Sequence, residues 1–128
     1  MKRYEIPDGT EVAGFYVRTV RTGPLVFVSG TTSLDAKGRV VGRDAAAQTH
    51  ASMRKIGKAL KSAGASFKDV TRVTIYCTDI RDMKPISEAF ARYFSKTRVA
   101  STLVAVSALA VPGLLVEIEA TAVLADGT

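Results

Sequence analysis

The 128-residue sequence contains one cysteine and one histidine, and it has no apolar run long enough to span a membrane. Cys77 therefore cannot form a disulfide within the chain, and a structural zinc site would have too few cysteine and histidine ligands. The first residues lack the apolar stretch of a secretory signal, so we expect a cytoplasmic protein that needs no metal for its fold.

Composition favours a single ordered domain covering residues 1–128. Hydrophobic residues make up 47% of the chain and charged residues 23%, and no low-complexity tract interrupts it. The net charge of +6 predicts a surface that attracts anions. The densest basic group, Arg54, Lys55, Lys58 and Lys61, falls on a predicted helix. A solvated helix face explains this group better than a nucleic-acid patch does, so we expect no nucleic-acid partner.

The first half of the chain predicts a hairpin followed by a helix. Residues 16–20 and 25–29 alternate with period 2 around a Gly-Pro turn, and residues 39–41 suggest a brief third strand. Asp44 is a suitable N-cap for a helix over residues 44–63, and Gly64 is a suitable residue to end it. The apolar stripe of this helix consists of Thr49, Met53, Ile56, Leu60 and Ala63.

The second half predicts a strand over residues 70–80 and a helix that begins near Met83 and ends near Ser95. Two further strands follow, over residues 101–109 and 114–124. The resulting order, ββ(β)αβαββ, indicates an α+β fold with a mixed sheet and two helices on one face. Because the last strands carry apolar side chains on both faces, we expect a second copy of the chain to cover the other face.

Several segments together resemble the RidA/YjgF family, which is also known as endoribonuclease L-PSP. They are Val26–Gly30, Gln48-Thr49, Ala63–Ser66, Asp69-Val70, Val73–Ile80, Pro112-Gly113 and Val116–Ala120. The resemblance implies a chorismate-mutase-like fold, a homotrimer and ligand clefts at the subunit boundaries. It also implies hydrolysis of reactive enamines and imines to 2-oxo acids and ammonia, with neither a metal nor an organic cofactor.

The resemblance also implies where a small molecule would bind. Tyr16 matches a tyrosine that lines the cleft, Ser29-Gly30 match a pair that offers backbone groups, and Glu117 matches a glutamate that holds water. Thr31 stands where the family usually has glutamine. Each residue also has a structural interpretation: Tyr16 as a half-buried strand tyrosine, Gly30 as a bend, and Glu117 as an exposed or salt-bridged partner of Glu119.

One expected residue is absent. The family has an arginine that grips the substrate carboxylate at the start of the penultimate strand, where this chain has Ser101, followed by Leu103 at the position of a small residue or cysteine. A serine hydroxyl cannot replace a bidentate guanidinium. Arg98 and Arg18 are the candidates to replace it, although each also fits a solvated surface arginine.

Strand alternation places Glu117 and Glu119 on one face, where burial between subunits would raise the pKa of at least one of them. Cys77 fits a buried thiol, and His50 falls on the helix side opposite the apolar stripe, where we expect it to be solvated.

Three functions remain open from the sequence. The first is an enzyme that hydrolyses or deaminates an imine, an enamine or a related small molecule, with Glu117 and Tyr16 as its catalytic residues. Its substrate would contact Ser29, Gly30, Thr31, Ser101, Leu103 and Arg98. The second is a trimer that binds a ligand without catalysis. The third is RNA binding or cleavage, which the sequence supports least because it has neither a stacking motif nor a clustered basic groove.

Overall fold

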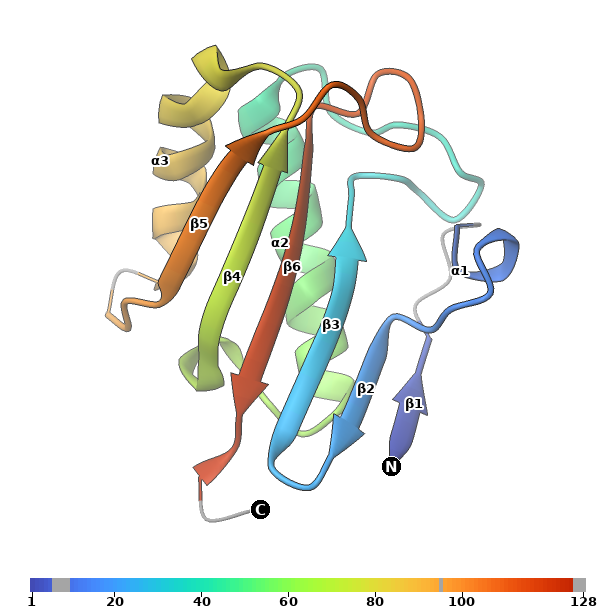
Figure 1. Ribbon diagram of the computed structural model, residues 1–128, viewed down its shortest axis with the longest axis vertical. Helices are drawn as coiled ribbons and strands as arrows, with labels where there is room; N and C mark the ends of the chain where they lie inside the picture. The colour runs from blue at the N-terminus through green and yellow to red at the C-terminus, as the bar shows by residue number, and fades with distance from the viewer. Residues whose placement is uncertain (6–9, 95, 126–128) are drawn as a thin grey trace.

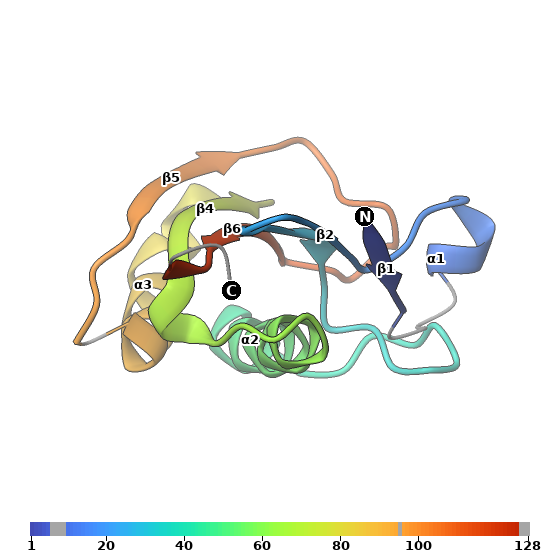
Figure 2. The same cartoon turned by 90° about the horizontal axis from the view of Figure 1, so that it is seen from below.

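The computed structural model describes residues 1–5, 10–94 and 96–125. Six strands form one sheet in the order β1-β2-β3-β6-β4-β5, and helices α2 and α3 lie together on one of its faces (Figures 1 and 2). The strands are β1 (Lys2–Tyr4), β2 (Thr19–Thr22), β3 (Leu25–Thr31), β4 (Val70–Cys77), β5 (Ala100–Ala105) and β6 (Val116–Val123). The helices are α1 (Thr10–Ala13), α2 (Ala45–Ser62) and α3 (Met83–Phe94).

Helix α2 forms as its sequence predicts. The Asp44 carboxylate accepts a hydrogen bond from the Ala47 amide at 2.8 Å, which caps the first turn. Gly64 follows the helix with a φ of +83°, in the left-handed region that glycine enters without strain. The predicted stripe from Thr49 to Ala63 is buried against the sheet. The prediction of this helix and of its inner face is confirmed.

Strand β6 lies between β3 and β4 in the sheet, and it carries Glu117. It pairs antiparallel with both β3 and β4, while β4 and β5 are parallel. Its side chains alternate as predicted: Val116, Ile118, Ala120 and Ala122 are buried beneath the helices, whereas Glu117 and Glu119 point to the opposite face.

Among the described residues no helix covers that opposite face, and we call it the open face (Figure 2). It carries four exposed apolar side chains, Leu25, Phe27, Val104 and Val123, which are 37–43% exposed. The strand register brings Leu25 beside Val123 and places Phe27 and Val104 on the same side of the sheet. Apolar side chains therefore lie on both faces of the sheet, as the sequence predicted.

Several boundaries differ from prediction. Strand β1 and helix α1 were not predicted. The strand predicted to begin at Tyr16 begins at Thr19, so Tyr16 and Val17 precede β2. Residues 39–41 contribute only one bridge, between Leu34 and Val40, since the loop turns before a ladder can form. Strand β4 ends at Cys77 because a 3-10 turn begins at Ile80, and β5 ends at Ala105 instead of residue 109. The predicted helix end near Ser95 lies outside the described residues; α3 ends at Phe94.

The core lies between the sheet and the two long helices. Within the part of the chain that the structure describes, none of the helices combines the length and the hydropathy needed to cross a bilayer. The observed fold is α+β with a mixed sheet, as predicted, and it has α1 as a third, short helix.

Candidate functional site

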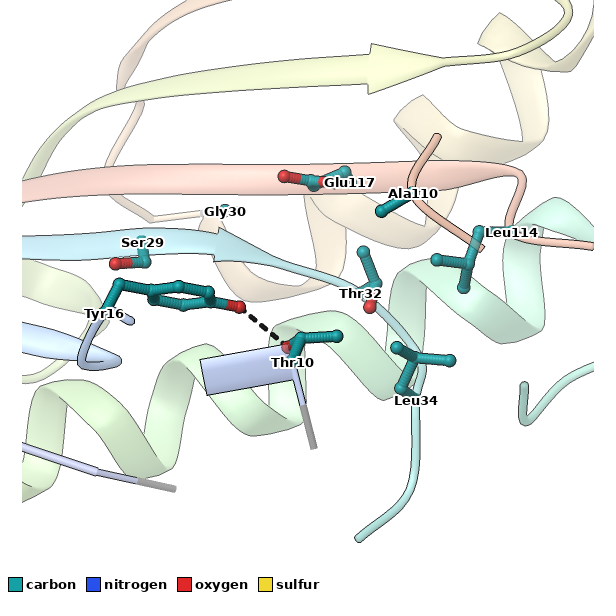
Figure 3. Close-up of a pocket in the computed structure, with 9 residues that line it drawn as sticks. All are labelled: Thr10, Tyr16, Ser29, Gly30, Thr32, Leu34, Ala110, Leu114 and Glu117. Atoms are coloured by element: carbon teal, nitrogen blue, oxygen red, sulfur yellow. Dashed lines mark hydrogen bonds between the residues drawn. The ribbon is translucent and has the colours of Figure 1, made fainter. Parts of the chain in front are cut away.

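A pocket of about 430 Å³ opens between the segment that contains α1, the C-terminal end of β3 and the N-terminal end of β6 (Figure 3). Its lining combines two loops with the sheet and consists of Thr10, Tyr16, Ser29, Gly30, Thr32, Leu34, Ala110, Leu114 and Glu117. The structure therefore brings together Tyr16, Ser29, Gly30 and Glu117, four of the residues predicted from the sequence.

Gly30 and Glu117 are in direct contact across β3 and β6. A Cβ atom built on Gly30 would overlap Oε2 of Glu117, so a larger residue here would displace the carboxyl group from this position. The pairing of β3 with β6 is irregular between Val28 and Thr31, which is the stretch that contains Gly30. The glycine therefore accommodates a close approach, and the group that approaches it within the chain is a carboxylate.

The surroundings of Glu117 alter its protonation. Burial raises the pKa of the Glu117 carboxyl, the positive charge of Arg18 acts in the opposite direction, and the negative charge of Glu119 raises it further. The net effect is a pKa above the ordinary value, so this carboxyl exchanges a proton closer to neutral pH than an exposed glutamate does.

Tyr16 forms the opposite wall of the pocket. Its ring is half-buried, and its hydroxyl lies 2.7 Å from Oγ1 of Thr10 on α1 (Figure 3). Ser29 lies between the two walls, and its hydroxyl donates to the carbonyl oxygen of Val17 at 2.8 Å. The serine hydroxyl therefore ties the Tyr16 segment to β3.

Arg18 lies behind Tyr16 and is fully buried. Its Nε donates to Oε1 of Glu11 at 2.8 Å, and both side chains are about 1% exposed. The sequence offered Arg18 as a solvated surface arginine or as an anion anchor. The first interpretation is wrong, because the preceding turn carries the side chain inward onto Glu11.

Thr31 follows Gly30 but is not among the residues that line the pocket. Its hydroxyl accepts a hydrogen bond from Arg18 and donates to the carbonyl oxygen of Ser29 at 2.7 Å. Thr31, which was predicted to contact the substrate, therefore lies next to the pocket lining and not in it.

The other predicted substrate contacts, Ser101, Leu103 and Arg98, do not line this pocket within one chain. Ser101 and Leu103 are on β5, which β4 and β6 separate from β3 in the sheet. The register aligns Ser101 with Val73 and Leu103 with Ile75. Arg98 is exposed and lines a separate groove with Phe90 and Phe94. One chain therefore does not assemble all the predicted substrate contacts.

Gln48 belongs to one of the segments that resemble the family, and it has a structural role that the sequence did not predict. Its amide nitrogen donates to the carbonyl oxygens of Gly42 and Gly113, and its amide oxygen accepts from the Leu115 amide at 2.8 Å. This buried side chain fixes the loop that leads into β6 to helix α2. It thereby sets the position of Leu114 and Glu117 in the pocket.

The remaining reactive side chains lie away from the pocket. Cys77 is buried, and burial raises the pKa of its thiol, as expected for a packed cysteine. His50 is only half-buried, and its Nδ1 lies 2.9 Å from the Tyr93 hydroxyl, so the expectation of a solvated ring is only partly met. Among the described residues, no three His, Cys, Asp or Glu side chains are grouped so that they could hold a metal ion.

Comparison with known proteins identifies the family of this chain. The family model of endoribonuclease L-PSP matches residues 8–124. The chain belongs to the RidA/YjgF family. Among RidA/YjgF relatives, the 3-aminoacrylate deaminase RutC of Acinetobacter baylyi is 37% identical over 123 residues, which cover 94% of this chain and 97% of the relative.

Two further RidA/YjgF relatives agree with this assignment. The human 2-iminobutanoate/2-iminopropanoate deaminase is 30% identical over 111 residues, covering 86% of this chain and 80% of the relative. The crystal structure of a YjgF/YER057c/UK114 family member from Mycobacterium tuberculosis superimposes with a TM-score of 0.88 at 44% identity. That match covers 96% of this chain and 98% of the other, so the whole α+β fold is shared.

Proposed function

We propose that this protein is an enzyme that hydrolyses an imine or enamine to a carbonyl compound and ammonia in the pocket between Tyr16 and Glu117. The observation that supports the proposal most is the contact between Glu117 and Gly30, which places a carboxyl group with a raised pKa at the pocket surface. The substrate class comes from the relatives, which are named as deaminases of 3-aminoacrylate and of 2-iminobutanoate and 2-iminopropanoate.

The reaction consumes one water molecule. Glu117 accepts a proton as water attacks the imine carbon, and this step forms the new C–O bond. The electron pair of the C=N π bond moves to the nitrogen, which takes this proton from Glu117 to give a carbinolamine. The hydroxyl proton of the carbinolamine then passes through Glu117 to the nitrogen, the C–N bond breaks, and ammonia leaves as the C=O bond forms. An enamine first takes up a proton on carbon to become the imine. Tyr16 lies across the pocket, where its hydroxyl can form a hydrogen bond with the substrate.

The charge of the substrate is a separate question. Relatives act on carboxylates by name, yet no lysine or arginine is among the residues that line the described pocket. We propose that the working form is a homotrimer and that each pocket is completed at a subunit boundary, where a second copy adds side chains. The exposed apolar residues of the open face support an association between copies, because water contact at Phe27 and Val104 is unfavourable.

A direct assay follows 2-iminopropanoate that an amino-acid dehydratase generates in the cuvette. We expect the imine to disappear faster with the protein than in buffer, with ammonia released in step. An unchanged rate of disappearance would contradict the proposal for this substrate class. An uncharged imine of similar size, assayed in parallel, tests whether the substrate carboxylate is needed.

A Glu117→Ala variant separates catalysis from binding. The proposal predicts that this variant loses turnover while a bound 2-oxo acid still raises its melting temperature. If every turnover detected in the wild type persists in the variant, a binding protein is the better account.

Light scattering tests the assembly. The homotrimer predicts a particle of three times the 13.6 kDa chain mass. A stable monomer at assay concentration would contradict the proposed completion of the pocket by a second copy.

A further inference from the structure

The guanidinium of Arg18 contacts both walls of the pocket, although it does not line the pocket itself. Its Nη1 donates to the carbonyl oxygen of Gly30 at 2.6 Å and to Oγ1 of Thr31 at 3.1 Å. Its Nη2 donates to the hydroxyl oxygen of Tyr16 at 3.3 Å, and its Cζ lies 5.4 Å from the centre of the Tyr16 ring. The Arg18 side chain is fully buried, and Glu11 balances its charge.

The contact with Tyr16 has a direction. Guanidinium nitrogens only donate hydrogen bonds, so the Tyr16 oxygen must be the acceptor in this pair. The hydroxyl proton of Tyr16 therefore does not point toward Arg18, and it is free to turn toward the pocket that Tyr16 and Thr10 line. A ligand atom in the pocket would meet this hydroxyl as a hydrogen-bond donor.

The contact with Gly30 acts on the other wall. Arg18 holds the carbonyl of Gly30 and the hydroxyl of Thr31 in the irregular stretch of β3, directly beneath the place where Glu117 rests. The positive charge of Arg18 also reaches Glu117. One buried cation thus hydrogen-bonds both to the Tyr16 hydroxyl and to the backbone that Glu117 contacts.

We propose that Arg18 is a positioning residue of this site, which orients Tyr16 as a hydrogen-bond donor toward the substrate and places a buried positive charge on the backbone of Gly30, against which Glu117 rests. The inference deepens the proposed function and rests on it for its kinetic consequences. It assigns the buried arginine to the internal organisation of the pocket, where its donors are directed to Glu11, Gly30, Thr31 and Tyr16.

The charges that face Glu117 determine the expected sign. Arg18 lowers the pKa of Glu117, while Glu119 on the same strand raises it. From β4, the Tyr76 hydroxyl lies close enough to sense the charge of Glu117, but it donates its hydrogen bond to Glu119. Tyr16 faces Glu117 across the pocket. Removal of the Arg18 charge should therefore raise the pKa of Glu117, and a reaction that needs the carboxylate should lose its rate at a higher pH.

The test is a Glu11→Gln/Arg18→Gln double variant, which removes both buried charges and leaves no unpaired ion in the core. With 2-iminopropanoate as the probe, we expect the acid limb of kcat/KM to move upward by about 1 pH unit. Arg18→Lys keeps the charge but reaches fewer partners, so it should keep the wild-type acid limb and lower kcat. Asp79→Asn/Arg81→Gln, which likewise removes one negative and one positive charge but from an ion pair whose side chains are 37% and 86% exposed, is the matched control.

A second readout does not depend on turnover. The carboxyl carbon of Glu117, followed by NMR with ¹³C-labelled glutamate, should titrate at a higher pH in the double variant than in the wild type. An unchanged titration and an unchanged acid limb in a folded double variant would overturn the inference. If the titration shifts but no imine is turned over by the wild type, the electrostatic role of Arg18 stands and the proposed function fails.

Discussion

The two walls of the pocket are held in place by different means. The β6 wall carries Glu117 on a strand that pairs on both sides, and the neutral amide of Gln48 fixes the loop that enters it. The other wall carries Tyr16 on a segment outside the sheet, and the buried pair of Arg18 and Glu11 attaches it to β3. One wall thus depends on backbone pairing on both sides of its strand, and the other depends on a buried ion pair together with the Ser29 hydroxyl.

This difference has an energetic consequence. Backbone ladders distribute their stability over many hydrogen bonds, so one substitution weakens them only slightly. A buried ion pair concentrates its contribution, because removal of one partner leaves the other charged in a dry environment. We therefore expect the Tyr16 wall to be the more sensitive of the two to a single change.

The largest effect should come from Arg18→Met. It leaves the Glu11 carboxylate buried without its cation, at a cost of about 3–5 kcal/mol in the free energy of unfolding. Urea denaturation monitored by circular dichroism measures this loss. A Glu11→Met/Arg18→Met variant is the matched control and should recover most of the stability. A loss below about 1 kcal/mol in the single variant would contradict the view that this pair anchors the wall.

Gln48→Leu should have the next largest effect, on the β6 wall. The substitution keeps the approximate size of the side chain but leaves the Gly113 carbonyl and the Leu115 amide without their side-chain partner. We expect a loss of about 2–3 kcal/mol in the same denaturation experiment. If instead Gln48→Leu costs more than Arg18→Met, the proposed ranking of the two walls is reversed.

Phe15 allows a smaller change in the opposite direction. This residue has a φ of +57°, its side chain is 96% exposed, and it directly precedes Tyr16. Phe15→Gly should stabilise the protein by about 1 kcal/mol, because glycine adopts this conformation without steric cost. Phe15→Ala removes the same ring but keeps the strain, so its melting temperature should stay near that of the wild type. Equal shifts in both variants would point to the ring and not to the backbone.

The smallest effect concerns pH. Because the pKa of Glu117 is raised on folding, the folded protein binds this proton more tightly than the unfolded chain does. The contribution of this proton to stability is present at low pH, and it falls as the pH rises from the ordinary glutamate pKa of 4.5 through the raised pKa of the folded state. Glu117→Gln should therefore be more stable than the wild type above this window and equal to it below. Melting curves from pH 4 to 8 would show a constant difference if Glu117 titrated normally.

The β6 wall could be predicted from the sequence because the patterns that reveal it, strand alternation and the Ser-Gly pair, involve only neighbouring residues. Alternation along residues 114–124 placed Glu117 and Glu119 together on the open face, and the Ser29-Gly30 pair was recognised next to it. Helix α2 was predicted equally well, since a cap, an apolar stripe and a terminal glycine all agreed.

The Tyr16 wall could not be predicted in the same way. The period-2 pattern that began at Tyr16 suggested a strand, but the left-handed conformation of Phe15 and the turn after α1 redirect the chain there. The pairing of Arg18 with Glu11 joins residues on either side of that turn, and no sequence period relates them. Ala110 and Leu114 reach the pocket only through the loop that Gln48 fixes, which depends on the folded arrangement.

The central claim is that Glu117, and not its neighbour on the same face, performs the proton transfers of the pocket. The most direct test compares ammonia release from 2-iminopropanoate in Glu117→Gln and in Glu119→Gln, which differ only in which carboxylate becomes an amide. We predict that kcat/KM falls by about 10²–10⁴-fold in Glu117→Gln and by less than about threefold in Glu119→Gln. Equal activity of the two variants would contradict the account.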